Sequence, residues 1–152
     1  MTLLSIDPGR SYKGDKTIGY CLFENWGDEI RRGSLSFEEL CKDLGFDHIG
    51  VFFQGRAIHS GVIEDFVNDP KSARGGQRNG TSECIGAVEY AFLKGETELT
   101  RQKNTILPVA KLQAGYVDTH KHLPHPDSAY LHGYYYLVSK GVLKPAGLEN
   151  TL

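Results

Sequence analysis

Three kinds of residue in this chain could take part in catalysis or binding. They are acidic residues at three separated positions, a group of histidines and one basic stretch. Asp7 ends an apolar run and is followed at once by Pro8 and Gly9. Because Pro and Gly end strands, we expect Asp7 at the last position of a strand, half in the core and half in a cleft. A carboxylate there costs free energy unless it is satisfied, and a hard cation satisfies it well. Backbone N–H groups of the turn are the alternative partners.

Glu64 and Asp65 repeat this pattern within the run Gly61–Val67, whose other residues include the β-formers Val, Ile and Phe. Two apolar strands that each carry an acid are a more specific signal than either alone. Successive strand residues point to opposite faces, so Asp65 would face away from Glu64 and is the poorer candidate. The alternative is that both acids lie on a solvated edge strand.

The stretch Asn68–Gly80 follows directly and carries Lys71, Arg74 and Arg78 among several glycines. Backbone amides and guanidinium groups in such a loop can approach phosphates closely. A plain polar surface loop is the alternative. The position of the stretch, immediately after an acidic strand, favours phosphate binding.

Histidines and a third acid occur near the C-terminus. The histidines are His120, His122, His125 and His132. They suggest zinc, but cysteine partners at ligand spacing are missing, so a structural zinc site is not favoured. The last helix is expected to begin about Pro126, which puts Asp127 in its first turn. The helix dipole favours a carboxylate there without any metal.

The N-terminal elements that must position these residues are expected to form a hairpin with an added edge strand. Residues 3–7 and 17–23 are interpreted as two strands with a short connection, and therefore as an antiparallel pair. Gly19, in the middle of the second strand, indicates close approach by another backbone or a ligand. Residues 33–37 suggest a third strand that returns along the second.

Helices and strands alternate in the rest of the chain. Ser36 and Glu39 have the spacing of a capping box, for a helix that Gly45 would stop. Residues 47–53 are expected to form a short extra strand or the start of a parallel crossover. The remaining expectations are an irregular stretch at 54–60, a helix from 81 or 82 to 94, a strand at 103–109 and a last helix from about 126 to 140.

Composition indicates the class of molecule. The chain has 152 residues, of which 39% are hydrophobic and 24% charged, and we expect one soluble domain spanning 1–152. No apolar run approaches the ~20 residues needed to span a bilayer and no secretion signal is found, so we expect a cytoplasmic protein without a membrane partner. Three scattered cysteines indicate free thiols. At a formal net charge of -2, nucleic-acid binding would need a local basic patch.

The order of these motifs resembles the RuvC group of Holliday-junction resolvases, within the RNase H-like superfamily, over nearly the full length. SIDPGR followed by TIGYCLF is similar to the opening IDPG motif and second strand, and GVIEDFV to the second acidic strand. The later loop, late strand and closing helix are similar to RGGQRNGTSECIGAVE, ILPVAK and HPDSAYLHGYYYLV. The compact size is most similar to a bacteriophage version. The resemblance implies an α/β fold of the RNase H-like type, with a central five-stranded mixed β-sheet flanked by helices on both faces.

The resemblance also implies a metal-dependent endonuclease that cleaves branched DNA such as Holliday junctions, in recombination and repair. Asp7, Glu64 and Asp127 would hold two Mg2+ or Mn2+ ions, which serve the attacking water and the leaving 3′ oxygen. Lys111 and the basic stretch would contact phosphates, and a homodimer would make two matched cuts. A non-cleaving module that binds branched DNA, or a broader nuclease for flaps, forks or hybrids, is the alternative.

The sequence departs from the family at one position. The family has a fourth group, Asp or His, three residues before the acid of the last helix, where this chain has Pro124. His122 and His125 flank that position, and either could take the role. His125 is closer to Asp127 and is therefore preferred, as a metal ligand or as a general acid that protonates the leaving oxygen.

Overall fold

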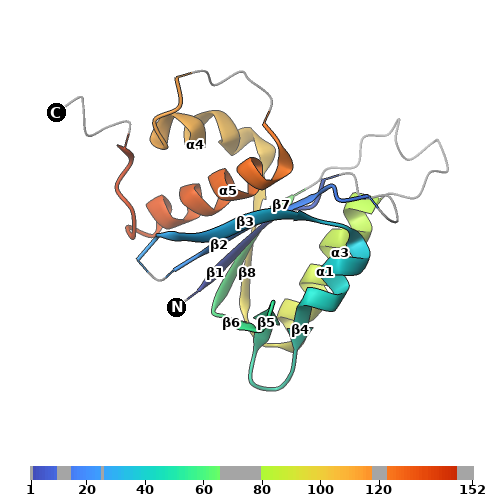
Figure 1. The fold of residues 1–152 in the computed structure, drawn as a ribbon. Coiled ribbons are helices and arrows are strands. Elements are labelled where there is room, and N and C mark those ends of the chain that lie inside the picture. Colours follow the sequence, from blue (N-terminus) through green and yellow to red (C-terminus); the bar gives the residue numbers. More distant parts are fainter. Residues whose placement is uncertain (1, 10–14, 25, 66–79, 118–122, 147–152) are drawn as a thin grey trace.

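The central sheet has five strands in the spatial order β3-β2-β1-β7-β8 (Figure 1). The computed structural model describes residues 2–9, 15–24, 26–65, 80–117 and 123–146. The strands are β1 Leu3–Asp7, β2 Ile18–Phe23, β3 Glu29–Leu35, β7 Ser60–Asp65 and β8 Glu98–Lys103. β2 runs antiparallel to β1 and β3, whereas β7 runs parallel to β1 and β8. The predicted mixed sheet of five strands is therefore confirmed.

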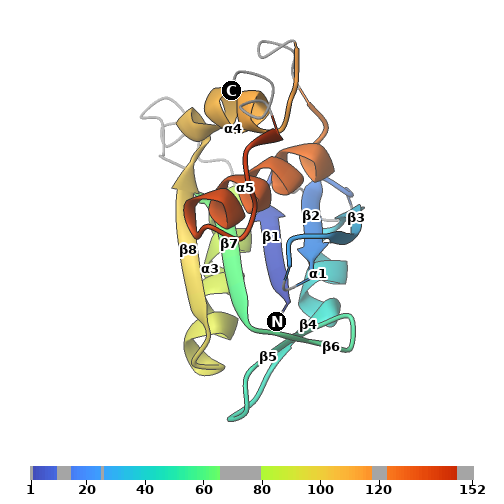
Figure 2. The same ribbon diagram turned by 90° about the vertical axis from the view of Figure 1, so that its left-hand side faces the viewer.

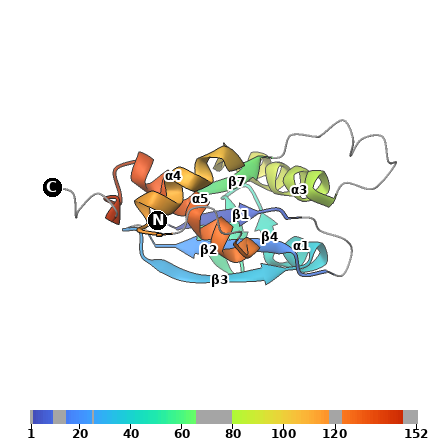
Figure 3. The same cartoon turned by 90° about the horizontal axis from the view of Figure 1, so that it is seen from above.

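Helices cover both faces of this sheet, as predicted. The helices are α1 Phe37–Asp43, α3 Gly80–Lys94, α4 Leu107–Gln113 and α5 His125–Ser139. α1 and α3 lie on one face, and α5 lies on the other with α4 packed against it (Figure 1). Seen from above, α5 lies over the sheet (Figure 3). No helix among the described residues is both long and apolar enough to cross a membrane.

Alternate residues of β1 belong to two separate hydrophobic cores. Leu4 and Ile6 pack in the core on the α3 side, together with Val88 and Phe92 of that helix. Leu3 packs in the core on the α5 side. Because strand side chains alternate between the two faces, Asp7 is placed on the α5 side of the sheet.

A small second sheet precedes β7. It contains β4 Leu44–Phe46, β5 Val51–Phe53 and β6 Arg56–Ile58, all antiparallel, and it lies at the end of the central sheet away from α4 (Figure 2). The strand expected within 47–53 is therefore confirmed as β5. The irregular stretch expected at 54–60 was wrong, because Gln54 and Gly55 both have positive φ, 51° and 77°, and form a tight hairpin turn into β6.

The helix ends follow local sequence signals. Ser36 Oγ accepts from the Glu39 backbone N–H at 3.1 Å, and Glu39 Oε1 accepts from the Ser36 N–H at 3.1 Å, so the predicted capping box is confirmed. The helix ends at Asp43, slightly before the stop expected at Gly45. At the end of α5, Gly141 has φ 75°, which suits a glycine after a helix terminus.

The strand predicted at 103–109 was wrong. The strand ends at Lys103, a single 3-10 turn η1 covers Asn104–Ile106, and α4 begins at Leu107. Pro108 lies in the first turn of α4, where its missing N–H costs no helical hydrogen bond. β8 itself is a polar edge strand in which only Gln102 is buried, so its apolar signal is slight.

Candidate active site

Four residues form a row across neighbouring strands at the carboxyl end of β1: Gly19 of β2, Asp7 of β1, Glu64 of β7 and Gln102 of β8. Asp7 pairs with Gly19 of β2, and Glu64 pairs with Gln102 of β8. The residues before Asp7 and Glu64 are themselves paired in the parallel register of β1 and β7. Asp7 and Glu64 are therefore neighbours on adjacent strands, which lie about 4.8 Å apart in a sheet, and point to the same face.

The amino-terminal half of α5 covers this row. His125, Ser128 and His132 occur at positions i, i+3 and i+7, so they share one side of the helix. That side faces the two carboxylates, because each of these three residues contacts Asp7 or Glu64.

Asp7 is held from two directions. Its Oδ1 accepts the Gly9 backbone N–H at 2.9 Å, and its Oδ2 lies 3.1 Å from Nδ1 of His125. Burial by itself would raise the pKa of Asp7, but hydrogen bonds from His125, Gly9 and Ser128 and the His125 charge bring that pKa below its ordinary value. The hydrogen bond to Asp7 raises the pKa of His125 in turn, against partial burial. The turn contact expected of Asp7 is therefore confirmed by the Gly9 N–H. The role of Asp7 in a functional site stays a prediction.

Glu64 is bound by two donors of α5. Ser128 Oγ donates to Glu64 Oε2 at 3.3 Å, and His132 Nε2 lies 2.9 Å from the same oxygen. The other ring nitrogen of His132 lies 2.8 Å from Oε1 of Gln102. The Ser128 hydroxyl is thus within reach of both carboxylates, Asp7 and Glu64.

Asp127, expected as the third metal-binding carboxylate, is bound elsewhere. Its Oδ1 accepts from Arg32 of β3 at 2.9 Å. Arg32 is also bound by Glu29, at 2.6 and 2.8 Å, and lies 4.2 Å from the ring centroid of Tyr130. Since each helical residue is turned about 100° from the last, Asp127 faces β3 while Ser128 faces the row. In this structure Ser128 therefore takes the place that the sequence analysis gave to Asp127.

Asp65 lies on the other face of the sheet, as predicted. It pairs with Arg101 of β8 at 3.3 Å, and Arg101 also pairs with Glu89 of α3. This surface network contacts none of the residues of the row. It supports the preference for Glu64 over its neighbour.

The residues predicted to bind DNA are only partly described. Lys71, Arg74 and Arg78 lie outside the described residues, as does His122, the alternative to His125. Lys111 is described, on α4 instead of after a strand, and only 7% of it is exposed. A residue so buried is poorly placed to contact a phosphate, and the prediction for Lys111 is not supported.

Sequence reasoning missed Ser128 and Gln102, and it considered His132 only as part of a zinc cluster. A signal for Ser128 and His132 was present, because both share the helical face of His125 at spacings of three and seven residues. Gln102 carried no such signal, since its role depends on the register of β8 against β7.

The donor set decides which metal the site suits. The described residues include no group of three His, Cys, Asp or Glu side chains placed to hold a metal ion. Asp7 and Glu64 do occupy neighbouring positions on the same face of adjacent strands, however, and Mg2+ is commonly bound through one or two carboxylates together with substrate phosphate and water. The residues present fit one hard divalent cation. They do not assemble the three carboxylates expected for two ions.

Comparison with known proteins identifies the fold. No family model and no curated protein sequence matches the chain. Among solved structures, it is similar to RuvC of Thermus thermophilus in complex with a Holliday junction substrate, at 14% sequence identity, TM-score 0.53, 95% coverage of this chain and 99% of that one. A second structure of the Thermus thermophilus RuvC matches at 13% identity and TM-score 0.50, with the same coverage. The chain therefore has the RuvC-type, RNase H-like α/β fold that the sequence predicted.

Proposed function

We propose that this chain is a divalent-metal-dependent endonuclease that cleaves branched DNA. The observation that supports this most strongly is the meeting of Asp7 and Glu64 on adjacent parallel strands, with Ser128 in reach of both, in a RuvC-type fold. Each carboxylate also has an oxygen that faces the shared side of the sheet, where a divalent cation could be bound. No other group of acids among the described residues lies beside a histidine in this way.

Each side chain has a distinct part in this proposal. Asp7 and Glu64 would hold Mg2+ or Mn2+, and the bound ion would supply charge neutralisation at the scissile phosphate. Ser128 would donate its single hydroxyl hydrogen to Glu64, next to Asp7. His125, whose pKa is raised by Asp7, carries a proton nearer to neutral pH and can donate it to the leaving 3′ oxygen.

Branched DNA is the proposed substrate because of the fold. One of the similar structures is a RuvC bound to a Holliday junction substrate. A four-way junction requires two matched cuts, so we propose a homodimer. Phosphate contacts from Lys71, Arg74 and Arg78 would position the DNA, and binding should then weaken steeply with salt.

A second candidate is a module of the same fold that binds branched DNA without cutting it. The pairing of Asp127 with Arg32 favours it, since this leaves two carboxylates where the sequence predicted three. A broader nuclease acting on flaps or forks differs from the first proposal only in substrate.

Cleavage assays separate these candidates. A labelled four-way junction, a fork, a flap and a linear duplex are incubated with the protein and Mg2+ or Mn2+. We expect nicked junction products from the wild type, and none from Asp7→Asn, which should still bind the junction. Asp65→Asn is the matched control on the opposite face and should cleave normally. Tight junction binding without any product from the wild type would favour the non-cleaving module, and full cleavage by Asp7→Asn would remove Asp7 from the site.

A further inference from the structure

His132 is a fully buried polar side chain beside the site. It has no exposed surface, and it joins two residues that are in register on neighbouring strands, Glu64 and Gln102. We propose that His132 and Gln102 are positioning residues that hold the Glu64 carboxylate in its metal-binding orientation. This inference rests on the proposed function, because it assigns Glu64 to a cation.

The hydrogen-bonding capacities of the three groups determine how the ring is held. An ionised carboxylate only accepts hydrogen bonds, so Nε2 of His132 must donate its N–H to Glu64 Oε2. Nδ1 faces the Gln102 amide, which presents either its oxygen or, turned over, its NH2 group. The Gln102 amide can therefore hydrogen-bond to Nδ1 of His132 whether or not Nδ1 carries a proton. In either form of the ring, Nε2 keeps its hydrogen bond to Glu64.

The hydrogen bonds from Ser128 and His132 to Glu64, here called the clamp, occupy one carboxylate oxygen of Glu64 and leave the other oxygen open. Oε2 receives two donors, Ser128 and His132, which are one helical turn apart on α5. Among the described residues, Oε1 makes no hydrogen bond or ion pair. The carboxylate is thus tied to the helix by one oxygen, and the second is available to a cation beside Asp7.

A histidine that only filled the core would be placed differently. A buried ring usually finds a backbone carbonyl or another buried group as its partner. His132 instead reaches a side chain that keeps 21% of its surface exposed, at the row that carries Asp7. Groups behind a metal ligand typically set its orientation, and their loss commonly lowers metal affinity by 10–100-fold.

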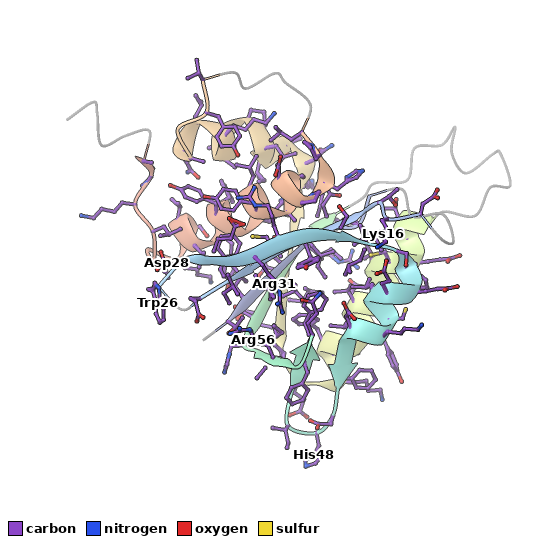
Figure 4. The ribbon with its side chains drawn as sticks, viewed as in Figure 1. Lys16, Trp26, Asp28, Arg31, His48 and Arg56 are labelled. Atoms are coloured by element: carbon purple, nitrogen blue, oxygen red, sulfur yellow. The ribbon has the colours of Figure 1, made fainter. Side chains whose placement is uncertain are left out.

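Three variants test the proposal. His132→Phe keeps a ring of similar size but removes the N–H, His132→Gln restores an N–H toward Glu64, and Gln102→Leu removes the group behind the ring. His48→Phe is the control, since His48 lies at the tip of the small sheet, far from α5 (Figure 4). Mn2+ binding is measured by electron paramagnetic resonance on the full chain without DNA, next to thermal unfolding.

We expect His132→Phe to weaken Mn2+ binding by about 10–100-fold. Gln102→Leu should have a smaller effect in the same direction, and His132→Gln should return affinity to within a few-fold of the wild type at a similar melting temperature. Equal Mn2+ affinity in wild type and His132→Phe would overturn the positioning role while leaving the nuclease proposal in place. Equal losses in the Phe and Gln variants would also overturn it, because restoring an N–H toward Glu64 would then have no effect on Mn2+ affinity. If the wild type bound no Mn2+, the proposed function would fail together with this inference.

A spectroscopic measurement covers the case in which the His132 variants do not fold. In the wild-type protein, the Nε2–H proton of His132 should exchange slowly and give a downfield NMR signal that Glu64→Ala removes. Loss of that signal in Glu64→Ala supports the clamp. Its absence from the wild type, or its persistence without the carboxylate, contradicts the clamp whether or not metal binds.

Discussion

The backbone carbonyl of His125 lies directly over Gly19, so close that a Cβ added to Gly19 would come within 2.1 Å of the carbonyl oxygen. This contact brings the start of α5 onto β2, beside the register position of Asp7. It is the close backbone approach that a glycine in the middle of a strand predicted. Because of it, the His125 ring reaches Asp7 at 3.1 Å.

Gly19→Ala should therefore damage both stability and activity. Overpacking a filled site typically costs about 1–3 kcal/mol, and here the obstacle is backbone, which yields poorly. Urea unfolding should show this loss, and the cleavage assay should show reduced activity because His125 moves away from Asp7. Gly86→Ala is the control: an added Cβ at Gly86 in α3 would meet no described atom outside its own helix within 4 Å, and alanine there should stabilise the helix by up to about 1 kcal/mol. If Gly19→Ala were as stable as the wild type, the close contact between Gly19 and the His125 carbonyl would be contradicted.

The contact of His125 with Asp7 predicts a pH dependence. The hydrogen bond and the negative charge of Asp7 raise the pKa of His125, so the pair stabilises the protein fully below the unfolded pKa of about 6.5 and loses this stabilisation as pH rises through the folded value. The lowered pKa of Asp7 sets the acidic limit, since the stabilisation is lost as pH falls through that value. An NMR titration of His125 should give a pKa above the ordinary one in the wild type and a lower pKa in Asp7→Asn. The same pKa in both proteins would refute the pairing.

The sequence predicted the elements in which local pattern and packing agree. Ser36 and Glu39 formed their capping box, because both halves of that motif are local. The strand at 103–109 was wrong for the opposite reason: β8 is polar, and only its parallel register with β7 makes it a strand. A single chain offers no local signal for that pairing.

The site was predicted in part. Asp7 and Glu64 were found because each interrupts or ends an apolar strand, which is visible in the sequence. The sequence pointed to Asp127, whereas the structure places the next residue, Ser128, against the row, because one residue turns a helix by about 100°. The rotation of α5 on the sheet depends on the contact of His125 with Gly19, which no helical periodicity reveals. Serine is also less conspicuous than a carboxylate as a functional residue.

Thiol reactivity tests the packing around the site. Cys21 and Cys84 have no exposed surface, whereas Cys41 is exposed on α1, although burial raises the pKa of all three thiols. Only the thiolate attacks a disulfide reagent, so Ellman's reagent should react quickly with one of the three thiols of the native protein. Unfolding in guanidinium should release the other two, and Cys41→Ser should remove the fast reaction. Rapid reaction of two or three native thiols would show that α3 or α5 is not packed as described.

The last prediction concerns the pair of Asp127 and Arg32. Arg32 and Asp127 keep 30% and 33% of their side chains exposed, and such pairs contribute about 0–1 kcal/mol to stability. If Asp127 does not bind metal, Asp127→Asn should lose at most about 1 kcal/mol of folding stability and cleave at close to the wild-type rate, whereas Asp7→Asn should lose cleavage. Cleavage rates of the two variants, measured side by side on the same junction, decide this.

If Asp127→Asn does lose cleavage, the variant Arg32→Ala shows why. Arg31, its neighbour on β3, lies on the side of the ribbon away from α5 and provides the matched control Arg31→Ala (Figure 4). Complete loss of cleavage in Asp127→Asn would mean that Asp127 leaves Arg32 when DNA and metal bind and joins Asp7 and Glu64. In that event Arg32→Ala should cleave faster or at lower metal concentration than Arg31→Ala, because the carboxylate is no longer held at β3. Equal behaviour of the two arginine variants, with Asp127→Asn active, would instead leave Asp127 as a structural partner of the edge strand.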